Sequence, residues 1–318
     1  MLLVIAISVG ATILLTRDSG NGTTQTASGN PPTTDAIASA GDTGPVSVLI
    51  NEPTCEAWRP INDTLARKQA ESWSERDYSR PASEWNTEQR LLHDDIATAM
   101  RSAADQTVAL AKATPNRIVR ELYEQAIAYW RAYADSIPTY TSRDNSLAGV
   151  AANASGAIVM LCAAIDYKSA SARAPLVSQH SESSNTTTPD DPASPEKFIN
   201  SSGNPICADW IELVNRFDSQ AAPWREVDPN LPASKWTPTQ AASMTAMQPV
   251  MTKLAEDIEA LGNRSDSAVI DDFASLSAQY WRAFVAAIPS YTSADSYLSG
   301  TASYVNFLLF DACTYSEA

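Results

Sequence analysis

Four cysteines are the residues in this sequence whose type and spacing point most clearly to chemistry. The interval from Cys55 to Cys162 equals the interval from Cys207 to Cys313 to within one residue. No cysteine lies within a few residues of another cysteine or of a histidine, so the close ligand spacing typical of zinc sites is missing. The pattern instead predicts disulfide bonds, which persist in oxidising compartments.

The equal cysteine intervals belong to a longer internal repeat with an offset of 151 residues. Tyr-Trp-Arg-Ala at 129–132 recurs at 280–283. Ile-Pro-Thr-Tyr-Thr-Ser at 137–142 recurs as Ile-Pro-Ser-Tyr-Thr-Ser at 288–293. Self-similarity at a fixed offset indicates duplication, so we predict two copies of one domain.

Each copy carries apolar residues at helical spacing, and neither has a sustained alternating strand pattern. The predicted helices cover residues 55–74, 87–113, 114–137 and 142–166 in the first copy, and 207–219, 238–261, 266–287 and 293–315 in the second. Pro249 lies inside one of them and should kink it. We therefore predict an all-α fold with two tandem four-helix bundles.

This topology selects one of the three ways to pair the cysteines. In an up-down-up-down bundle, the start of the first helix and the end of the fourth lie at the same end. Cys55 and Cys162 occupy these positions in the first copy, and Cys207 and Cys313 occupy them in the second. We predict these two disulfides, each of which would contribute about 4 to 5 kcal/mol in the chain-entropy model.

The chain opens with an apolar run without a charged residue, at residues 1–16. It is slightly shorter than the roughly 20 residues that span a bilayer, and no Lys or Arg precedes it. We predict an uncleaved transmembrane anchor, with a cleaved signal sequence as the alternative. Because the disulfides need an oxidising compartment, we place the protein in the cell membrane, single-pass, with its C-terminal domains outside the cytoplasm.

Two polar stretches separate these elements, and their composition is typical of solvated spacers. The predicted organisation is a transmembrane anchor at 1–16, a Ser/Thr/Gly-rich stalk at 17–50, a first bundle at 51–168, a Ser/Thr/Pro-rich linker at 169–202 and a second bundle at 203–318.

Charge and motif content argue against two classes of function. The chain has 22 Lys plus Arg against 37 Asp plus Glu, a formal net charge of -15, so nucleic acid is not an expected partner. Of the two histidines, His180 falls in the predicted linker, and His93 has Met244 at the corresponding position of the second copy. The sequence has no phosphate-binding glycine loop, nucleophile elbow or dinucleotide motif. We expect no enzymatic activity, no metal and no cofactor, and an enzyme of an unrecognised type is the remaining alternative.

The repeated segments between the third and fourth helices allow two interpretations. In the architectural one, the aromatic residues fill the bundle, the proline ends one helix and the hydroxyls cap the next. In the functional one, Arg131, Tyr140, Arg282 and Tyr291 form a partner-binding corner, because aromatic residues and arginine are typical interface anchors.

The Ala-rich, Arg-over-Lys composition, the single anchor, the Ser/Thr-rich stalk and the paired Cys-X-X-Trp bundles resemble exported, membrane-anchored proteins of mycobacteria and related actinobacteria. This resemblance implies a cell-envelope location and no known activity. We predict a non-enzymatic extracytoplasmic scaffold or accessory subunit that binds another cell-envelope protein, since linked modules raise effective concentration. The alternative is a sensor or carrier that binds a lipid or other apolar envelope ligand between helices.

Overall fold

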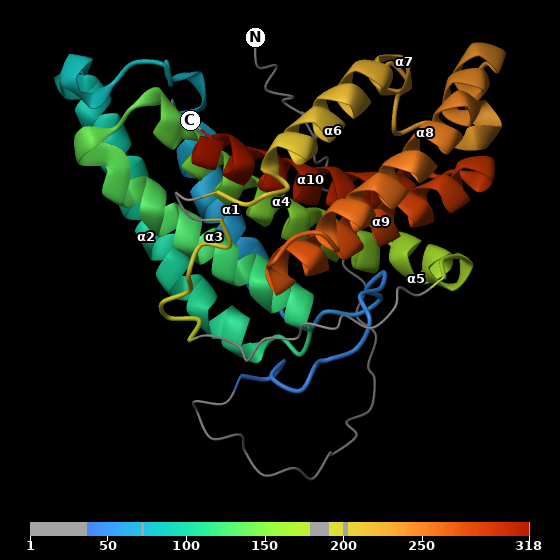
Figure 1. Cartoon of the computed structure of the whole chain (residues 1–318), viewed down its shortest axis with the longest axis horizontal. Coiled ribbons are helices and arrows are strands. Elements are labelled where there is room, and N and C mark those ends of the chain that lie inside the picture. The colour runs from blue at the N-terminus through green and yellow to red at the C-terminus, as the bar shows by residue number, and fades with distance from the viewer. Residues whose placement is uncertain (1–36, 71–72, 179–190, 200–202, 318) are drawn as a thin grey trace, which may run out of the picture. The chain divides into compact units, whose positions relative to one another are not determined.

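The computed structural model describes residues 37–70, 73–178, 191–199 and 203–317 (Figure 1). The regular structure in these ranges is helical, without a strand, which confirms the predicted all-α fold. The predicted transmembrane helix at residues 1–16 lies outside the described residues, and so does His180. Residues Asp35–Ala318 form one compact unit.

The long helices of this unit fall into two halves. The first half consists of α1 (Cys55–Ala70), α2 (Thr87–Ala113), α3 (Arg117–Ser136) and α4 (Asn145–Asp166). The second half consists of α6 (Cys207–Gln220), α8 (Pro238–Gly262), α9 (Ala268–Ala287) and α10 (Ser296–Glu317). The short helix α5 (Ser169–Arg173) follows α4, and α7 (Ala222–Arg225) follows α6. Helices α8, α9 and α10 begin 151 residues after α2, α3 and α4, which supports the predicted duplication.

Equivalent helices in the two halves start in the same way. The Gln89 backbone N–H donates to the Asn86 side chain at 2.8 Å, and the Asn86 N–H donates to the Gln89 side chain at 3.0 Å. Thr237 and Gln240 make the same reciprocal pair of bonds at the start of α8. These capping boxes satisfy backbone donors that the first helical turn leaves free, so α2 and α8 begin at matching positions.

Both predicted disulfides are present. Cys55 bonds to Cys162 with a Cα–Cα distance of 5.6 Å, and Cys207 bonds to Cys313 with a Cα–Cα distance of 5.0 Å. Each bond joins the start of the first long helix of a half to the end of the last one. The predicted pairing is therefore confirmed.

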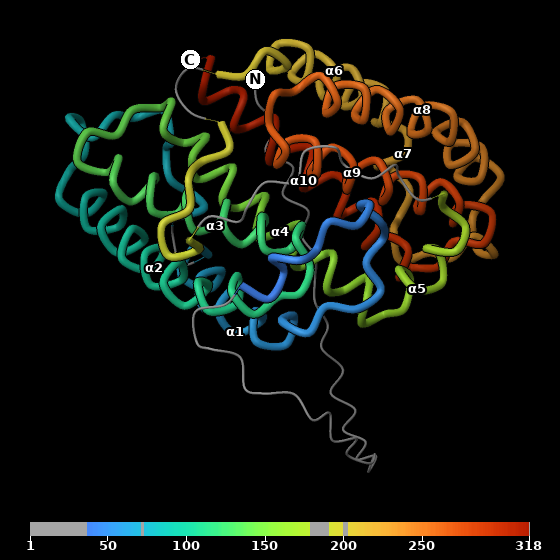
Figure 2. The backbone as a smooth tube through the Cα atoms, turned by 60° about the horizontal axis from the view of Figure 1, so that its bottom comes forward, coloured from blue at the N-terminus to red at the C-terminus, as the bar shows by residue number. Residues whose placement is uncertain are grey.

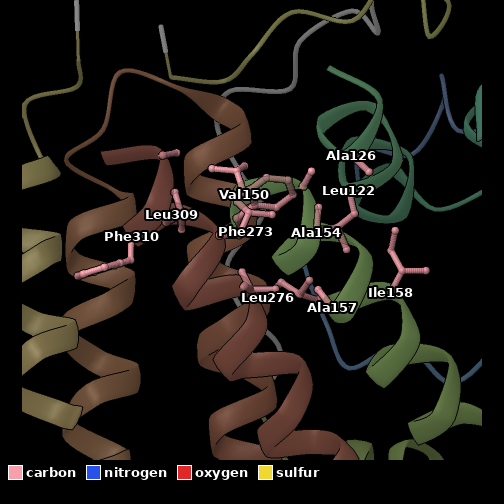
Figure 3. Packing of buried hydrophobic residues seen from close by; sticks show 14 of the residues in the cluster. Leu122, Ala126, Val150, Ala154, Ala157, Ile158, Phe273, Leu276, Leu309 and Phe310 are labelled. Carbon is pink, nitrogen blue, oxygen red and sulfur yellow. The ribbon is translucent and has the colours of Figure 1, made fainter. Parts of the chain in front are cut away.

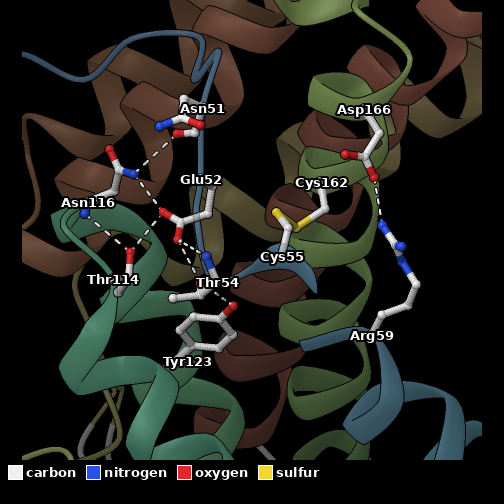
Figure 4. The surroundings of a disulfide bond; sticks show 10 residues. All are labelled: Asn51, Glu52, Thr54, Cys55, Arg59, Thr114, Asn116, Tyr123, Cys162 and Asp166. Atoms are coloured by element: carbon white, nitrogen blue, oxygen red, sulfur yellow. Dashed lines mark hydrogen bonds and ion pairs between the residues drawn. A yellow bond between two sulfur atoms is a disulfide. The ribbon is translucent and has the colours of Figure 1, made fainter. Parts of the chain in front are cut away.

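Hydrogen bonds hold the chain in place beside the first disulfide (Figure 4). The Glu52 carboxylate accepts from the Thr54 backbone N–H at 2.9 Å and from the Thr114 hydroxyl at 2.8 Å. It also accepts from the Asn116 amide at 2.6 Å. Because Thr114 and Asn116 lie between α2 and α3, these bonds fix the start of α1 against that turn.

The two halves share one core. Helices α4 and α10 lie side by side and make the most extensive helix contact in the described unit (Figure 2). Buried apolar side chains continue from Leu122 on α3 through Ala154 on α4 to Phe273 on α9 and Leu309 on α10 (Figure 3). The assignment of the two repeat copies as separate domains stays a prediction. In the structure, the two halves are in contact through this shared core.

The contact between α4 and α10 is reciprocal. A Cβ atom at Gly149 would lie 2.2 Å from a carboxylate oxygen of Asp311, and a Cβ atom at Gly300 would lie 2.9 Å from the sulfur of Met160. Gly149 corresponds to Gly300, and Met160 to Asp311, at the offset of the repeat. Each half thus offers the same surface to the other, as the subunits of a two-fold dimer do.

The segments before each half are also exchanged between the halves. The Tyr129 hydroxyl on α3 donates to the backbone carbonyl of Ile199, which precedes the second half, at 3.1 Å. Its counterpart Tyr280 on α9 lies beside the backbone of Leu49, which precedes the first half. Val46 and Val48 are buried. The predicted stalk and linker are therefore partly folded, at residues 37–50 and in α5 and 191–199.

Candidate functional site

The two tyrosines of the predicted partner-binding corner are buried. Tyr140 is 1% exposed and Tyr291 is 4% exposed. Their hydroxyls donate to the backbone carbonyls of Tyr78 at 2.9 Å and Pro229 at 2.7 Å. Both rings therefore position the loop that leads into the second long helix of their half, which favours the architectural interpretation.

The two arginines of the corner belong to separate ion pairs. Arg131 donates to Asp105 at 2.7 Å, and Arg282 forms an ion pair with Glu259. Their side chains are each 30% exposed. Both side chains are thus only partly exposed and already paired, and a binding role for the corner stays a prediction.

A groove of about 750 Å³ lies between α6 and α8 in the second half; we call it the α6–α8 groove. Five apolar side chains form its floor: Leu213, Phe217, Val250, Leu254 and Leu261. Of these, Phe217 and Val250 remain partly exposed.

Charged side chains from both helices line the rim of this groove. Arg264 donates to Asp209 at 2.7 Å, so this pair joins the end of α8 to the start of α6. Arg216 on α6 lies 3.2 Å from Asp257 on α8, which also pairs with Lys253 on its own helix. Exposed ion pairs contribute little stability, so these side chains can change partners at low cost.

Several positions that line this groove carry larger side chains than their counterparts in the first half. The α2 residues Ala99, Ser102 and Ala103 correspond to Val250, Lys253 and Leu254 on α8. Helices α1 and α2 make a more extensive contact with each other than α6 and α8 do.

A cluster of buried charges joins α3, α9 and the segment before α1. Arg117 donates to the Asp272 carboxylate at 2.7 and 3.0 Å and to the backbone carbonyl of Asp42 at 2.7 Å. Arg120 bonds to Glu124 and donates to the Ser39 hydroxyl at 3.0 Å. These contacts tie three parts of the chain together.

Within this cluster, the carboxylate of Glu121 is buried close to a second acidic side chain. Burial, with the neighbouring Asp272, raises the pKa of Glu121 well above its usual range. The Glu121 side chain is 3% exposed, so a substrate could not reach it in this conformation. The cluster therefore has a structural role and does not support catalysis.

The first half also contains a buried histidine, His93, at the position that Met244 occupies in the second half. His93 stacks on Trp85 at a ring distance of 3.8 Å, and its Nδ1 lies 2.8 Å from the Gln89 carbonyl. Its Nε2 is buried without a hydrogen-bond partner, and burial lowers the pKa of His93. A histidine enclosed in this way is not placed for acid–base work on a ligand.

Residues 37–317 match the family described as mycobacterial ESX-1 associated protein. The chain belongs to this family. It is 42% identical over 301 residues to an uncharacterised protein of Mycolicibacterium smegmatis (strain MKD8), covering 94% of this chain and 80% of that protein. No solved structure matches the chain. The predicted resemblance to mycobacterial proteins without known activity is confirmed.

The described ranges bear on metal binding and on membrane insertion. No group of three or more His, Cys, Asp and Glu residues there could hold a metal ion. One helix there, Ser142–Asp166, is long and apolar enough to cross a membrane, but most of its apolar window is buried inside the fold. This burial is typical of a central core helix.

The α6–α8 groove was not predicted from the sequence. The available signal was the change from small residues on α2 to larger residues on α8, together with Pro249, which also lines the groove. These sequence differences can be seen when the two copies are aligned at the offset of 151 residues. The concave surface itself depends on how α6 packs against α8, which the sequence does not show.

Proposed function

We propose that this member of the ESX-1 associated family is a non-enzymatic, extracytoplasmic accessory protein that binds another cell-envelope protein through the α6–α8 groove. The family description supports a role beside the ESX-1 secretion system. The observation that carries the proposal is the groove itself, with its apolar floor and charged rim. Protein interfaces commonly combine a hydrophobic centre with a polar edge.

The two disulfides support the proposed location. Bonds such as Cys55–Cys162 and Cys207–Cys313 form and persist in oxidising compartments. The apolar run at residues 1–16 would hold the protein in the membrane as a single-pass anchor. The folded unit would then lie outside the cytoplasm, within reach of other envelope proteins.

The fold also provides a rigid support for binding. Helix α10, which ends at the second disulfide, packs along α4 and against α6 and α9. Buried ion pairs such as Arg117–Asp272 join the halves at α3 and α9. A surface that is held in place before binding loses less conformational entropy on association.

A pair of charge substitutions on α8 tests this proposal in the full chain, expressed in its own membrane. Val250→Glu places a carboxylate on the groove floor, whereas Thr252→Glu places the same charge on an exposed position outside the groove. We expect Val250→Glu to abolish stoichiometric co-purification of an envelope protein, because a buried unpaired charge is costly. Thr252→Glu should retain it.

Circular dichroism and thermal melting of both variants provide the folding control. If both variants are folded and co-purify with the same partner in equal amounts, the groove is not the binding site. If an apolar lipid co-purifies in place of a protein and is lost in Val250→Glu, the carrier interpretation replaces the accessory one.

A further inference from the structure

The buried charge cluster between α3 and α9 contains more acidic than basic side chains. Arg117 and Arg120 are buried, and so are the three carboxylates that face them, on Asp272, Glu121 and Glu124. Both oxygens of Asp272 accept from Arg117, and both oxygens of Glu124 accept from Arg120. These two acids already balance the two guanidinium charges before Glu121 is counted.

Glu121 is thus the surplus acid of the cluster. Its Oε1 lies 3.3 Å from Arg120, and its Oε2 is buried without a hydrogen-bond partner among the described residues. An ionised carboxylate is costly in such a place, whereas a protonated one carries no charge. The surroundings of Glu121 therefore favour the neutral acid.

The internal repeat explains why two acids meet here. Glu121 and Asp272 occupy equivalent positions at the offset of 151 residues. Equivalent residues of a two-fold arrangement meet each other near its axis. Burial raises the pKa of Glu121, and the charge of Asp272 raises it further. Two carboxylates in one site do not both ionise freely, so one of them keeps its proton to a higher pH.

Charged side chains on the neighbouring described elements are acidic or are bound elsewhere. Asp42, on the segment before α1, accepts from the Arg117 backbone N–H at 2.7 Å. Asp271, next on α9, is also acidic. In the segment before α6, Glu196 is exposed and Lys197 lies over an aromatic ring of α10. The two α3 arginines are therefore the positive charges that act on the buried acid.

A short stretch of irregular chain covers the two arginines. Arg120 donates to the Ser39 hydroxyl at 3.0 Å, and Arg117 donates to the backbone carbonyl of Asp42 at 2.7 Å. This stretch, at residues 37–50, contains turns and no helix or strand, whereas α3 and α9 are core helices of 20 residues each. Segments with few regular hydrogen bonds open at lower free energy than core helices. Water would therefore reach the cluster most easily by displacing residues 37–50, which we call the strap.

We infer that the strap is controlled by a proton: it is held down while Glu121 and Asp272 keep one proton between them, and it is released when that proton is lost. Loss of the proton leaves three buried carboxylates against two arginines, and lifting the strap lets water solvate them. The strap lies between the folded unit and the predicted anchor at residues 1–16, so its release lengthens that connection. This inference does not depend on the α6–α8 groove.

Hydrogen–deuterium exchange of the oxidised full chain in detergent, corrected for the intrinsic effect of pH on exchange, tests the inference. The Ala38 amide donates to the Lys112 carbonyl at 2.9 Å, so the peptide that contains it reports on the strap. Because the closed form binds the proton more tightly, the strap is most stable at low pH and loses protection by up to about tenfold per pH unit as the pH rises. We expect a loss of at least about tenfold between about pH 5 and about pH 7, with the amides of α3 and α9 unchanged.

Two variants identify the group that titrates. Glu121→Gln keeps the shape of the side chain and removes its proton exchange, so protection of the strap should become independent of pH. Asp311→Asn removes another carboxylate whose pKa is raised by burial, at the contact between α4 and α10, and should leave the pH dependence of the strap in place.

Three outcomes would overturn the inference. Constant protection of the strap in the native chain would do so whether or not the variants fold. The native pH dependence in Glu121→Gln would assign the proton to another group. An equal loss of protection in α3 and α9 would mean that the two halves separate together, without a local release of the strap.

Discussion

Asp311 should make the contact between α4 and α10 sensitive to pH. Its carboxylate packs against Gly149, where a Cβ atom would lie only 2.2 Å away, and it accepts one hydrogen bond from Asn153 at 2.9 Å. Burial raises the pKa of Asp311 to about 7. At the equivalent position of the first half, the uncharged side chain of Met160 packs against Gly300.

The sign and size of the effect follow from this raised pKa. The folded chain binds the Asp311 proton more tightly than the unfolded chain, whose pKa is near 3.8. Stability from this group is therefore complete below about pH 4 and is lost as the pH rises towards 7. Three pKa units correspond to about 4 kcal/mol. Because the side chain is mostly buried but keeps some contact with solvent, water screens part of this cost, and we expect about 2 kcal/mol.

Asp311→Asn keeps the shape of the side chain and removes its titration. We expect the variant to have nearly the same free energy of unfolding as the native chain at pH 4 and to be about 2 kcal/mol more stable at pH 8. Guanidinium denaturation of the oxidised full chain at both pH values measures the difference. Asp311→Met, which copies the equivalent residue of the first half, should show the same trend. An advantage independent of pH in both variants would mean that Asp311 titrates normally in the folded protein.

Three further changes have clear expected outcomes. His93→Met, the residue at this position in the second half, removes the buried unpaired Nε2 and should stabilise the fold by about 1 kcal/mol at pH 7. Because burial lowers the pKa of His93, the native chain should also lose stability below about pH 6.5, and the variant should lose less in the same denaturation assay. Gly156→Ala places a Cβ atom 2.4 Å from the Tyr304 ring and should cost about 1 to 3 kcal/mol, whereas Gly41→Ala, with nothing within 4 Å, should be nearly neutral in thermal melts. Serine at both cysteines of the first disulfide should cost about 4 to 5 kcal/mol in chemical denaturation, and an unchanged midpoint would refute that role.

The sequence predicted the helices from local patterns and the disulfides from the order and direction of those helices. The apolar spacing of residues 87–113 and the Asn86–Gln89 capping box are contained within a short stretch of chain. The pairing of Cys55 with Cys162 required only the alternation of helix directions. Neither the helix boundaries nor the disulfide pairing required knowledge of how the two halves pack together.

The association of the two halves depends on distant contacts and was not predicted. One signal was present: α4 is apolar around most of its circumference, which is typical of a helix enclosed on all sides. The extended segments gave no comparable signal, because their polar composition suggested a spacer. Arg117 and Arg120 hold residues 39–44 through backbone carbonyls and a hydroxyl, and such bonds leave no pattern in the sequence.

The α6–α8 groove lies at positions where the two repeated halves of the chain differ in sequence. Equivalent positions on α2 and α8 carry Ala99 and Ala103 in one half and Val250 and Leu254 in the other. Two identical halves would give either two closed helix pairs or two grooves. In the second half, a groove lies between α6 and α8 at these positions. If the α6–α8 groove is the binding site, each chain would bind one partner there, and the proposed complex would contain equal numbers of both proteins.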